Sequence, residues 1–187
     1  VAAEHGLPYE RPPLSKPDGG GAIEKPICTL ESLQVSKIDL LTGVRVQTAD
    51  RAARKVSLSD GTTLPYDKLL LATGATPRKL TCAGGELALS LRTLGDARQI
   101  YAAAVPGARV TVIGGGLIGL ELAAVLAGRR VQVTVLEYGP RPLGRNVPEA
   151  LAARIADRHR AEGVVILCNV AIAGVTQSEV SLADSRT

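Results

Sequence analysis

The sequence contains no phenylalanine, tryptophan or methionine, and its only aromatic residues are four tyrosines. Proteins that bind single-stranded nucleic acid usually stack bases on aromatic side chains and concentrate basic residues in one patch. Here 22 basic residues stand against 18 acidic ones, a formal net charge of only +4. Nucleic-acid binding is therefore not the leading candidate function. The same composition predicts a core of leucine, isoleucine, valine and alanine.

Cysteine is also scarce: Cys28, Cys82 and Cys168 lie far apart in the chain. This spacing provides neither the C-x-x-C pair of a redox or metal site nor an even-numbered disulfide framework. We expect free thiols, as in a reducing cytoplasm, and no metal site. The chain starts at Val1 without a basic and apolar leader, so we expect no signal peptide and a cytoplasmic location.

No apolar run has the character of a membrane span. The longest, residues 110–127, is nearly long enough but contains Glu121 and four glycines. We therefore predict that the protein has no membrane-spanning segment. With 187 residues, 45% of them hydrophobic, the chain is typical of one large globular domain or two small ones.

The first part of the chain is rich in turn-forming residues and short β-like runs. Proline and glycine are frequent over the first 30 residues, which predicts an extended segment without long helices. Strand-like runs follow at residues 44–48, 55–58 and 68–72, with Asp60-Gly61 as a hairpin turn. The run over 68–72 is continuously apolar and is typical of a strand buried on both faces.

A helix is expected over residues 94–104, and Pro106-Gly107 after it is the predicted domain boundary. Beyond this boundary strands and helices alternate, and runs over 170–176 and 179–183 indicate a closing hairpin. Right-handed crossovers turn such a βαβαβ order into a parallel sheet flanked by helices. The expected strands are 109–113, 130–137 and 164–167, and the expected helices are 117–126 and 147–161.

A glycine-rich turn carries the strongest functional signal. Gly114, Gly116 and Gly119 fit G-x-G-x-x-G directly after a strand and at the start of a helix. In a Rossmann-like domain the first glycine permits the tight turn, the second lets the backbone approach a pyrophosphate, and the third allows close helix packing. The candidate dinucleotide-binding residues are therefore the whole turn, Gly114, Gly115, Gly116, Leu117, Ile118 and Gly119. The alternative is a glycine-rich turn that serves packing alone.

Glu137, at the end of the next expected strand, is placed to accept hydrogen bonds from the hydroxyls of an adenosine ribose. A carboxylate there repels a 2′-phosphate, which favours NADH over NADPH. Arg141 and Arg145 follow closely and keep the alternative open, because arginines near this strand hold the 2′-phosphate of NADPH in other proteins. We predict NADH, and include Arg145 among the candidate cofactor contacts.

Three segments together resemble the FAD-dependent ferredoxin and rubredoxin reductases, which serve oxygenases and to which apoptosis-inducing factor is related. These segments are residues 8–16 (PYERPPLSK), 66–78 (YDKLLLATGATPR) and 114–121 (GGGLIGLE). The resemblance runs over essentially the whole chain but corresponds only to the middle of the family's sequences. It implies a two-dinucleotide architecture like that of glutathione reductase: a partial FAD-binding Rossmann-like domain at residues 1–105 and an NADH-binding domain at 106–187.

The resemblance also implies roles for individual residues. Glu4 matches the acid that holds the adenosine ribose of FAD, and Val44 aligns with a backbone contact to its adenine. Arg11 and Lys16 match residues that face the FAD pyrophosphate and flavin ring, and Lys16 pairs with Glu121 near flavin N5. From the sequence alone, an isolated Glu4 is more often a solvated acid. Ala72, Thr73 and Gly74 match the turn where the chain crosses between domains.

Cysteine placement separates this branch from its relatives. Disulfide reductases carry C-x-x-x-x-C after the acid that corresponds to Glu4, and thioredoxin reductases carry C-x-x-C ahead of the nucleotide loop; neither pair is present. The resemblance therefore implies electron transfer to a ferredoxin or rubredoxin partner. Arginines could steer such an acidic partner, or simply form a solvated face; they are Arg129, Arg130, Arg154, Arg158 and Arg160.

The function predicted from the sequence is that of a flavoprotein oxidoreductase that moves hydride from NADH to FAD and passes electrons onward. Lys16 and Glu121 are the candidate catalytic residues. Two alternatives remain: a non-catalytic NADH-binding fragment, and a redox protein like apoptosis-inducing factor.

Overall fold

The computed structural model describes residues 1–17, 23–144 and 146–183. The chain divides into two compact units, which we describe separately. Unit 1 comprises Val1–Glu10 and Lys25–Ala75, and unit 2 comprises Arg11–Glu24 and Thr76–Thr187. This division by packing differs from the boundary proposed at Pro106-Gly107, because the described residues of 11–24 and residues 76–105 group with the C-terminal part of the chain. The division into FAD and NADH domains stays a prediction about cofactors.

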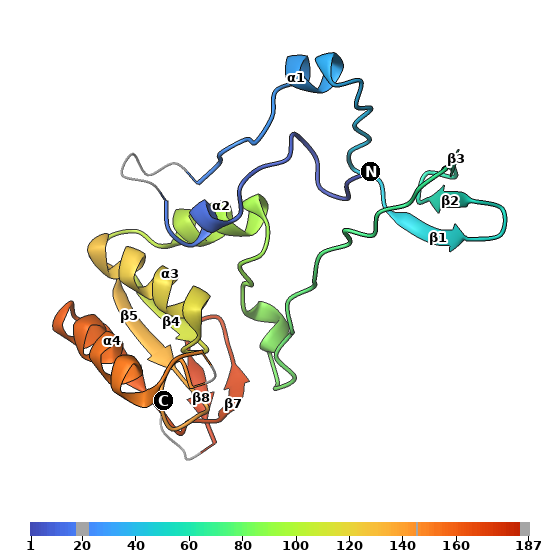
Figure 1. Cartoon of the computed structure of the whole chain (residues 1–187). Coiled ribbons are helices and arrows are strands. Elements are labelled where there is room, and N and C mark those ends of the chain that lie inside the picture. The colour runs from blue at the N-terminus through green and yellow to red at the C-terminus, as the bar shows by residue number, and fades with distance from the viewer. Residues whose placement is uncertain (18–22, 145, 184–187) are drawn as a thin grey trace. The chain divides into compact units, whose positions relative to one another are not determined.

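Unit 2 is built on the predicted parallel sheet (Figure 1). Its strands β4 (Arg109–Ile113), β5 (Gln132–Leu136) and β6 (Val165–Leu167) lie in that order, with both pairs parallel. The connecting helices are α3 (Leu117–Gly128) and α4 (Glu149–Ala161). This confirms the α/β class and the βαβαβ order.

The helices α3 and α4 pack beside each other. The imidazole Nε2 of His159 on α4 lies 3.1 Å from the carbonyl oxygen of Leu120 on α3. The core beneath them consists of aliphatic side chains, among which Leu126 and Val135 are completely buried. The absence of large aromatic residues is thus accommodated by leucine, valine and alanine, as the composition predicts.

Further elements complete unit 2. Helix α2 (Leu94–Ala103) begins with a capping box between Thr93 and Asp96, and its Ile100 joins the core. Short 3-10 turns occur at Pro12–Leu14 and Gly85–Leu87. The closing hairpin is formed by β7 (Ile172–Val175) and β8 (Val180–Leu182), which are antiparallel as predicted.

Unit 1 contains a three-stranded antiparallel sheet and one short helix. The sheet consists of β1 (Val46–Asp50), β2 (Lys55–Leu58) and β3 (Thr63–Pro65), with the expected turn at Asp60-Gly61 joining β2 to β3. Gly61 has a φ of +86°, a left-handed conformation that favours glycine. Helix α1 (Leu30–Val35), which sequence reasoning missed, begins with a capping box between Thr29 and Ser32.

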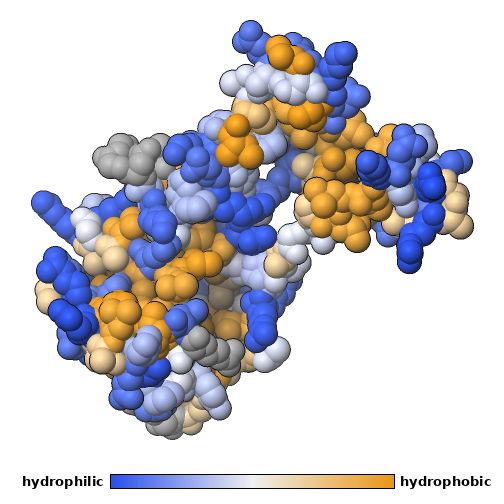
Figure 2. All heavy atoms as spheres, viewed as in Figure 1, coloured by the Kyte–Doolittle hydropathy of each residue, from blue (hydrophilic) through white to orange (hydrophobic). Residues whose placement is uncertain are grey.

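The strand predicted over residues 68–72 is wrong. Leu70 and Leu71 are 87% and 73% exposed, and within the described ranges no strand pairs with this segment. A buried parallel strand needs hydrogen-bonding neighbours on both sides, so an apolar run without such neighbours stays extended. Apolar side chains gather on the visible face of unit 1 (Figure 2).

Among the helices of the described ranges, none is long and apolar enough to cross a membrane.

Candidate dinucleotide and electron-transfer site

The glycine turn links β4 to α3 as the motif predicts. Gly114 has a φ of +106°, which an L-amino acid with a side chain rarely adopts. Its N–H donates to the Leu136 carbonyl at the end of β5, 2.8 Å away, and so ties the turn to the neighbouring strand. The turn is therefore held in one shape by backbone geometry and by the sheet.

Gly116 is the N-cap of α3, and a Cβ built there meets no atom within 4 Å. The space that a side chain would occupy is thus open toward the first turn of the helix. Gly116 has no side chain to cap this end, so its residue type leaves the first amide N–H groups of α3 able to donate to a ligand. Leu117 and Ile118 in this turn are 53% and 56% exposed.

Gly119 has a different role because it lies against the turn itself. A Cβ at this position would overlap the carbonyl oxygen of Gly114 and lie 3.3 Å from Cγ1 of Val112 on β4. Only glycine lets the helix approach the strand this closely. The arrangement matches the one expected for a pyrophosphate-binding loop.

Glu137 follows β5 and its carboxylate is held by two backbone amides. Oε2 accepts from the N–H of Gly115 at 2.8 Å, and Oε1 accepts from that of Gly139 at 2.7 Å. A carboxylate has further lone pairs that can accept from ribose hydroxyls. The carboxylate also lies close to Cys168, whose thiol pKa is raised first by burial and then by the charge of Glu137.

Arg141, one of the two arginines that follow Glu137, is hydrogen-bonded to the loop ahead of α4. Its Nη2 donates to the carbonyl oxygens of Val147, at 3.1 Å, and Gly144, at 3.3 Å. Its buried Nη1 has no hydrogen-bond partner in the described part of the chain. Arg141 therefore braces the loop ahead of α4. Arg145, the other candidate, lies outside the described residues.

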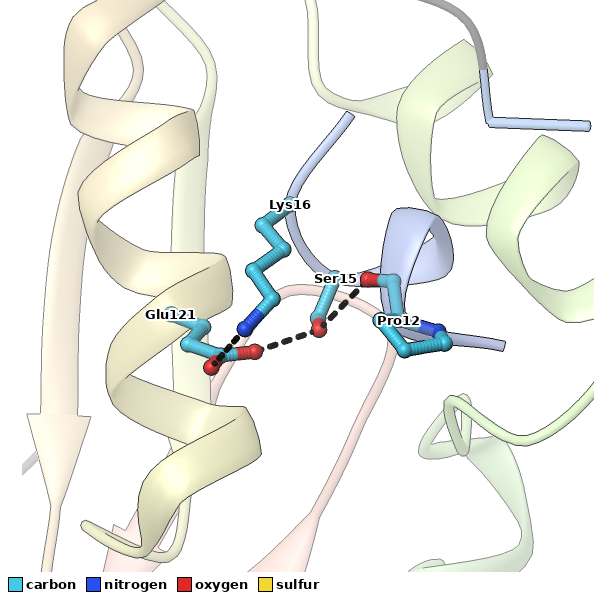
Figure 3. Close-up of polar contacts among 4 residues, drawn as sticks. All are labelled: Pro12, Ser15, Lys16 and Glu121. Atoms are coloured by element: carbon cyan, nitrogen blue, oxygen red, sulfur yellow. Dashed lines mark hydrogen bonds and ion pairs between the residues drawn. The ribbon is translucent and has the colours of Figure 1, made fainter. Parts of the chain in front are cut away.

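Lys16 and Glu121 form an ion pair, with 2.9 Å between Nζ and Oε1 (Figure 3). Glu121 comes from the first turns of α3, two residues after Gly119, whereas Lys16 follows the 3-10 turn at Pro12–Leu14. The other carboxylate oxygen, Oε2, accepts from the Ser15 hydroxyl at 2.7 Å. Both oxygens of Glu121 are thus engaged by neighbouring residues of one segment.

The surroundings of Glu121 affect its ionisation in opposite directions. Burial favours the neutral acid, but the hydroxyl of Ser15 and the ammonium of Lys16 together outweigh it and hold the pKa of Glu121 below its ordinary value. The carboxylate side chain is 34% exposed and that of Lys16 is 55% exposed. The Glu121 carboxylate is therefore charged at neutral pH, and both side chains of the pair are partly accessible.

The segment that carries Lys16 is fixed to the rest of unit 2 by contacts that sequence reasoning missed. Leu14 is buried, and its carbonyl accepts from the Tyr101 hydroxyl at 3.1 Å. The guanidinium of Arg129 lies 4.5 Å above the Tyr101 ring. Arg11 donates to the carbonyl oxygen of Arg92. No local signal marks Tyr101 or Ser15, because their partners are distant in sequence.

The candidate FAD residues of unit 1 fall into two groups. Glu4 and Val44 lie near each other: the Glu4 carbonyl accepts from Gly43, the residue before Val44, at 3.2 Å. The Glu4 carboxylate accepts from the Tyr9 hydroxyl, so Glu4 is not an isolated solvated acid. Ala72, Thr73 and Gly74 are exposed, and Gly74 has a φ of +72°.

A shallow apolar pocket of about 240 Å³ adjoins Glu121 between α3 and α4. Leu117, Ala124, Ile155 and His159 contribute to its lining. Both ring nitrogens of His159 face carbonyl oxygens, so its imidazole contributes to the packing of the two helices.

A family model described as pyridine nucleotide-disulphide oxidoreductase matches residues 1–187. In sequence, the chain is 40% identical over 169 residues to the ferredoxin--NAD(+) reductase component of the anthranilate 1,2-dioxygenase system of Burkholderia cepacia. The match covers 88% of this chain and 42% of that relative.

Two solved structures are similar in fold and in sequence. Putidaredoxin reductase, in its covalent complex with putidaredoxin, matches with a TM-score of 0.90 and 34% identity over 98% of this chain and 48% of its own. The ferredoxin reductase for the CYP199A2 system from Rhodopseudomonas palustris matches with a TM-score of 0.88 and 32% identity over 100% and 49%. The chain thus spans less than half the length of these relatives.

Proposed function

Because this chain belongs to the pyridine nucleotide-disulphide oxidoreductase family, we propose that the whole protein transfers hydride from NADH to FAD and delivers electrons to a ferredoxin or rubredoxin-type partner. The observation that carries the proposal is the Lys16–Glu121 ion pair, two residues beyond the last glycine of the nucleotide loop. This position brings a fixed pair of charges close to the start of the helix that receives the pyrophosphate.

The loop and Glu137 fit NADH. The open space at Gly116 and the uncapped amides of α3 suit a pyrophosphate, which also gains from the positive end of the helix dipole. Glu137 offers its remaining lone pairs to the ribose hydroxyls and repels a 2′-phosphate. Arg141, engaged with two carbonyls, supports the same preference.

The proposed FAD contacts follow from the family resemblance. They are Glu4 at the adenosine ribose, Val44 at the adenine, Arg11 and Lys16 at the pyrophosphate and flavin, and the turn at Ala72, Thr73 and Gly74. When bound, FAD accepts a hydride and releases electrons singly, whereas the protein supplies binding, orientation and electrostatics. In this proposal Lys16 places a positive charge at the flavin, and its ion pair with Glu121 holds that charge in a defined position.

The electron acceptor is proposed from the relatives and from the cysteines. Two of the similar proteins are named for their ferredoxins, and a third is seen joined to putidaredoxin. The three cysteines are free thiols and none lies next to another, which does not favour a thiol relay. A cytoplasmic location is part of the proposal, because free thiols are typical of a reducing compartment.

Anaerobic rapid mixing tests the proposal on the full-length protein. We expect NADH to bleach the flavin absorbance, and cytochrome c reduction to require an added ferredoxin. Purified protein that contains no flavin, or flavin that NADH leaves oxidised, would show that the function is different. Reduction without any ferredoxin dependence would remove the proposed partner while leaving the flavin chemistry intact.

A further inference from the structure

Ser15 stands out because it is the one polar residue among the buried residues of the described chain. It is 6% exposed, and its Oγ lies 2.7 Å from Oε2 of Glu121. Among the described residues, the other partner of this hydroxyl is the Pro12 carbonyl at 3.4 Å, a weaker contact within its own turn. The short distance to the carboxylate is typical of a hydrogen bond to a charged acceptor.

We propose that Ser15 is a positioning residue that fixes the Glu121 carboxylate so that Oε1 is presented to Lys16. A carboxylate bound at one oxygen can rotate, whereas one bound at both has a defined plane. With Ser15 on Oε2 and Lys16 on Oε1, the pair is held from a single short segment. Figure 3 shows both side chains reaching the carboxylate from that segment.

The segment itself is rigid enough to transmit this constraint. Leu14 is 3% exposed and its carbonyl accepts from Tyr101 on α2. Ser15 follows directly, and its own N–H donates to the Pro12 carbonyl at 3.3 Å. Backbone hydrogen bonds at Leu14 and at Ser15 therefore hold the residue that carries this hydroxyl. Its position does not depend on whether Glu121 is ionised.

Ser15 has an effect on the protonation of Glu121 that is separate from the effects of the charged groups nearby. Lys16 faces the carboxylate from the same segment, and His159 of α4 lines the adjoining pocket with both nitrogens directed at carbonyls. As a donor to Oε2, the Ser15 hydroxyl stabilises the ionised carboxylate more than the neutral acid. Removal of this donor raises the pKa of Glu121, because burial favours the neutral acid and Lys16 alone then counteracts it.

The first measurement follows the Glu121 carboxyl by carbon NMR during an acid titration of the full-length protein, with Glu121→Gln to assign the signal. We expect Ser15→Ala to move the Glu121 titration to higher pH, and Ser15→Thr, which keeps a hydroxyl, to restore it. Ser15→Cys keeps the size with a weak donor and should behave like the alanine variant. Ser181→Ala is the matched control, since Ser181 is also part-buried but its hydroxyl donates to the Gly174 carbonyl, 3.3 Å away.

The second measurement depends on the proposed function. We expect Ser15→Ala to slow flavin reduction by NADH about threefold to tenfold at acidic pH, with KM for NADH within about twofold, because a hydrogen bond to a charged group is lost. An unchanged Glu121 titration in both Ser15→Ala and Ser15→Cys would overturn the inference, even if NADH still reduces the flavin. A shifted titration in a protein that NADH does not reduce would support the inference and refute the proposed function.

Discussion

Replacement of Gly119 by alanine tests the physical basis of the nucleotide loop. The added Cβ would overlap the Gly114 carbonyl oxygen, which is backbone and cannot rotate away. Helix α3 must then move from β4, and overpacking of this kind costs about 1–3 kcal/mol. Alanine recovers about 1 kcal/mol in helix propensity, so we expect a net loss of up to about 2 kcal/mol in the free energy of unfolding.

Gly128 is the matched control on the same helix. A Cβ there meets nothing within 4 Å, so Gly128→Ala should be neutral or stabilise the protein by up to about 1 kcal/mol. The two variants should thus differ by about 2 kcal/mol, which corresponds to roughly 4–8 °C in Tm for a chain of this size. Circular dichroism during urea and thermal unfolding measures the difference.

Binding of NADH provides a second readout for the same pair of variants. Displacement of α3 moves its first amides relative to Gly114 and Gly116, so Gly119→Ala should also bind NADH more weakly, whereas Gly128→Ala should not. Equal unfolding free energies in the two variants, together with equal NADH affinity, would refute the argument that close packing at Gly119 positions the pyrophosphate site.

Three further predictions concern charged residues of the site. The wild-type protein should bind NADH at least about tenfold more tightly than NADPH, a difference of about 1.4 kcal/mol, and titration of Glu137→Ala should show a smaller gap because ribose hydroxyls lose an acceptor and a 2′-phosphate is no longer repelled. Lys16→Ala should slow flavin reduction in stopped-flow experiments while NADH affinity stays within about threefold, because the proposed contacts to the pyrophosphate and ribose of NADH lie at the glycine turn and Glu137. An unchanged reduction rate and an unchanged flavin potential would show that the ion pair is purely structural. The pKa of Glu121 is lowered on folding, so its contribution to stability is present above the ordinary value of 4.5 and is lost as the pH falls through the lower folded value. Glu121→Gln should remove this dependence from acid unfolding curves.

The sequence was sufficient for the strand, glycine turn and helix that follow one another over residues 109–128. The strand Arg109–Ile113 agrees with the prediction residue for residue, and α3 starts at the predicted Leu117. Here a β-branched run, a glycine turn and an apolar helix follow one another within a few residues, so local preference and tertiary packing agree. The positive φ of Gly114 and the tight contact at Gly119 follow from the same motif.

Helix α1 and the run over residues 68–72 both differ from what local sequence patterns indicate. The pair Thr29 and Ser32 forms the capping box that begins α1, but the usual sequence signature of such a box has glutamate or glutamine in the place of Ser32. The run over residues 68–72 shows the opposite case. Its composition is that of a buried strand, but composition cannot supply the neighbouring strands that a parallel sheet requires.

The contacts that hold the segment around Lys16 in place were decided by tertiary structure. Resemblance suggested that Lys16 and Glu121 form a pair, but nothing in the sequence connects the hydroxyl of Ser15 to a carboxylate 106 residues away. The same holds for Tyr101 and the Leu14 carbonyl, 87 residues apart. Sequence patterns report the periodicity of single elements, whereas a hydrogen bond between distant residues depends on how those elements pack, which requires the coordinates of both partners.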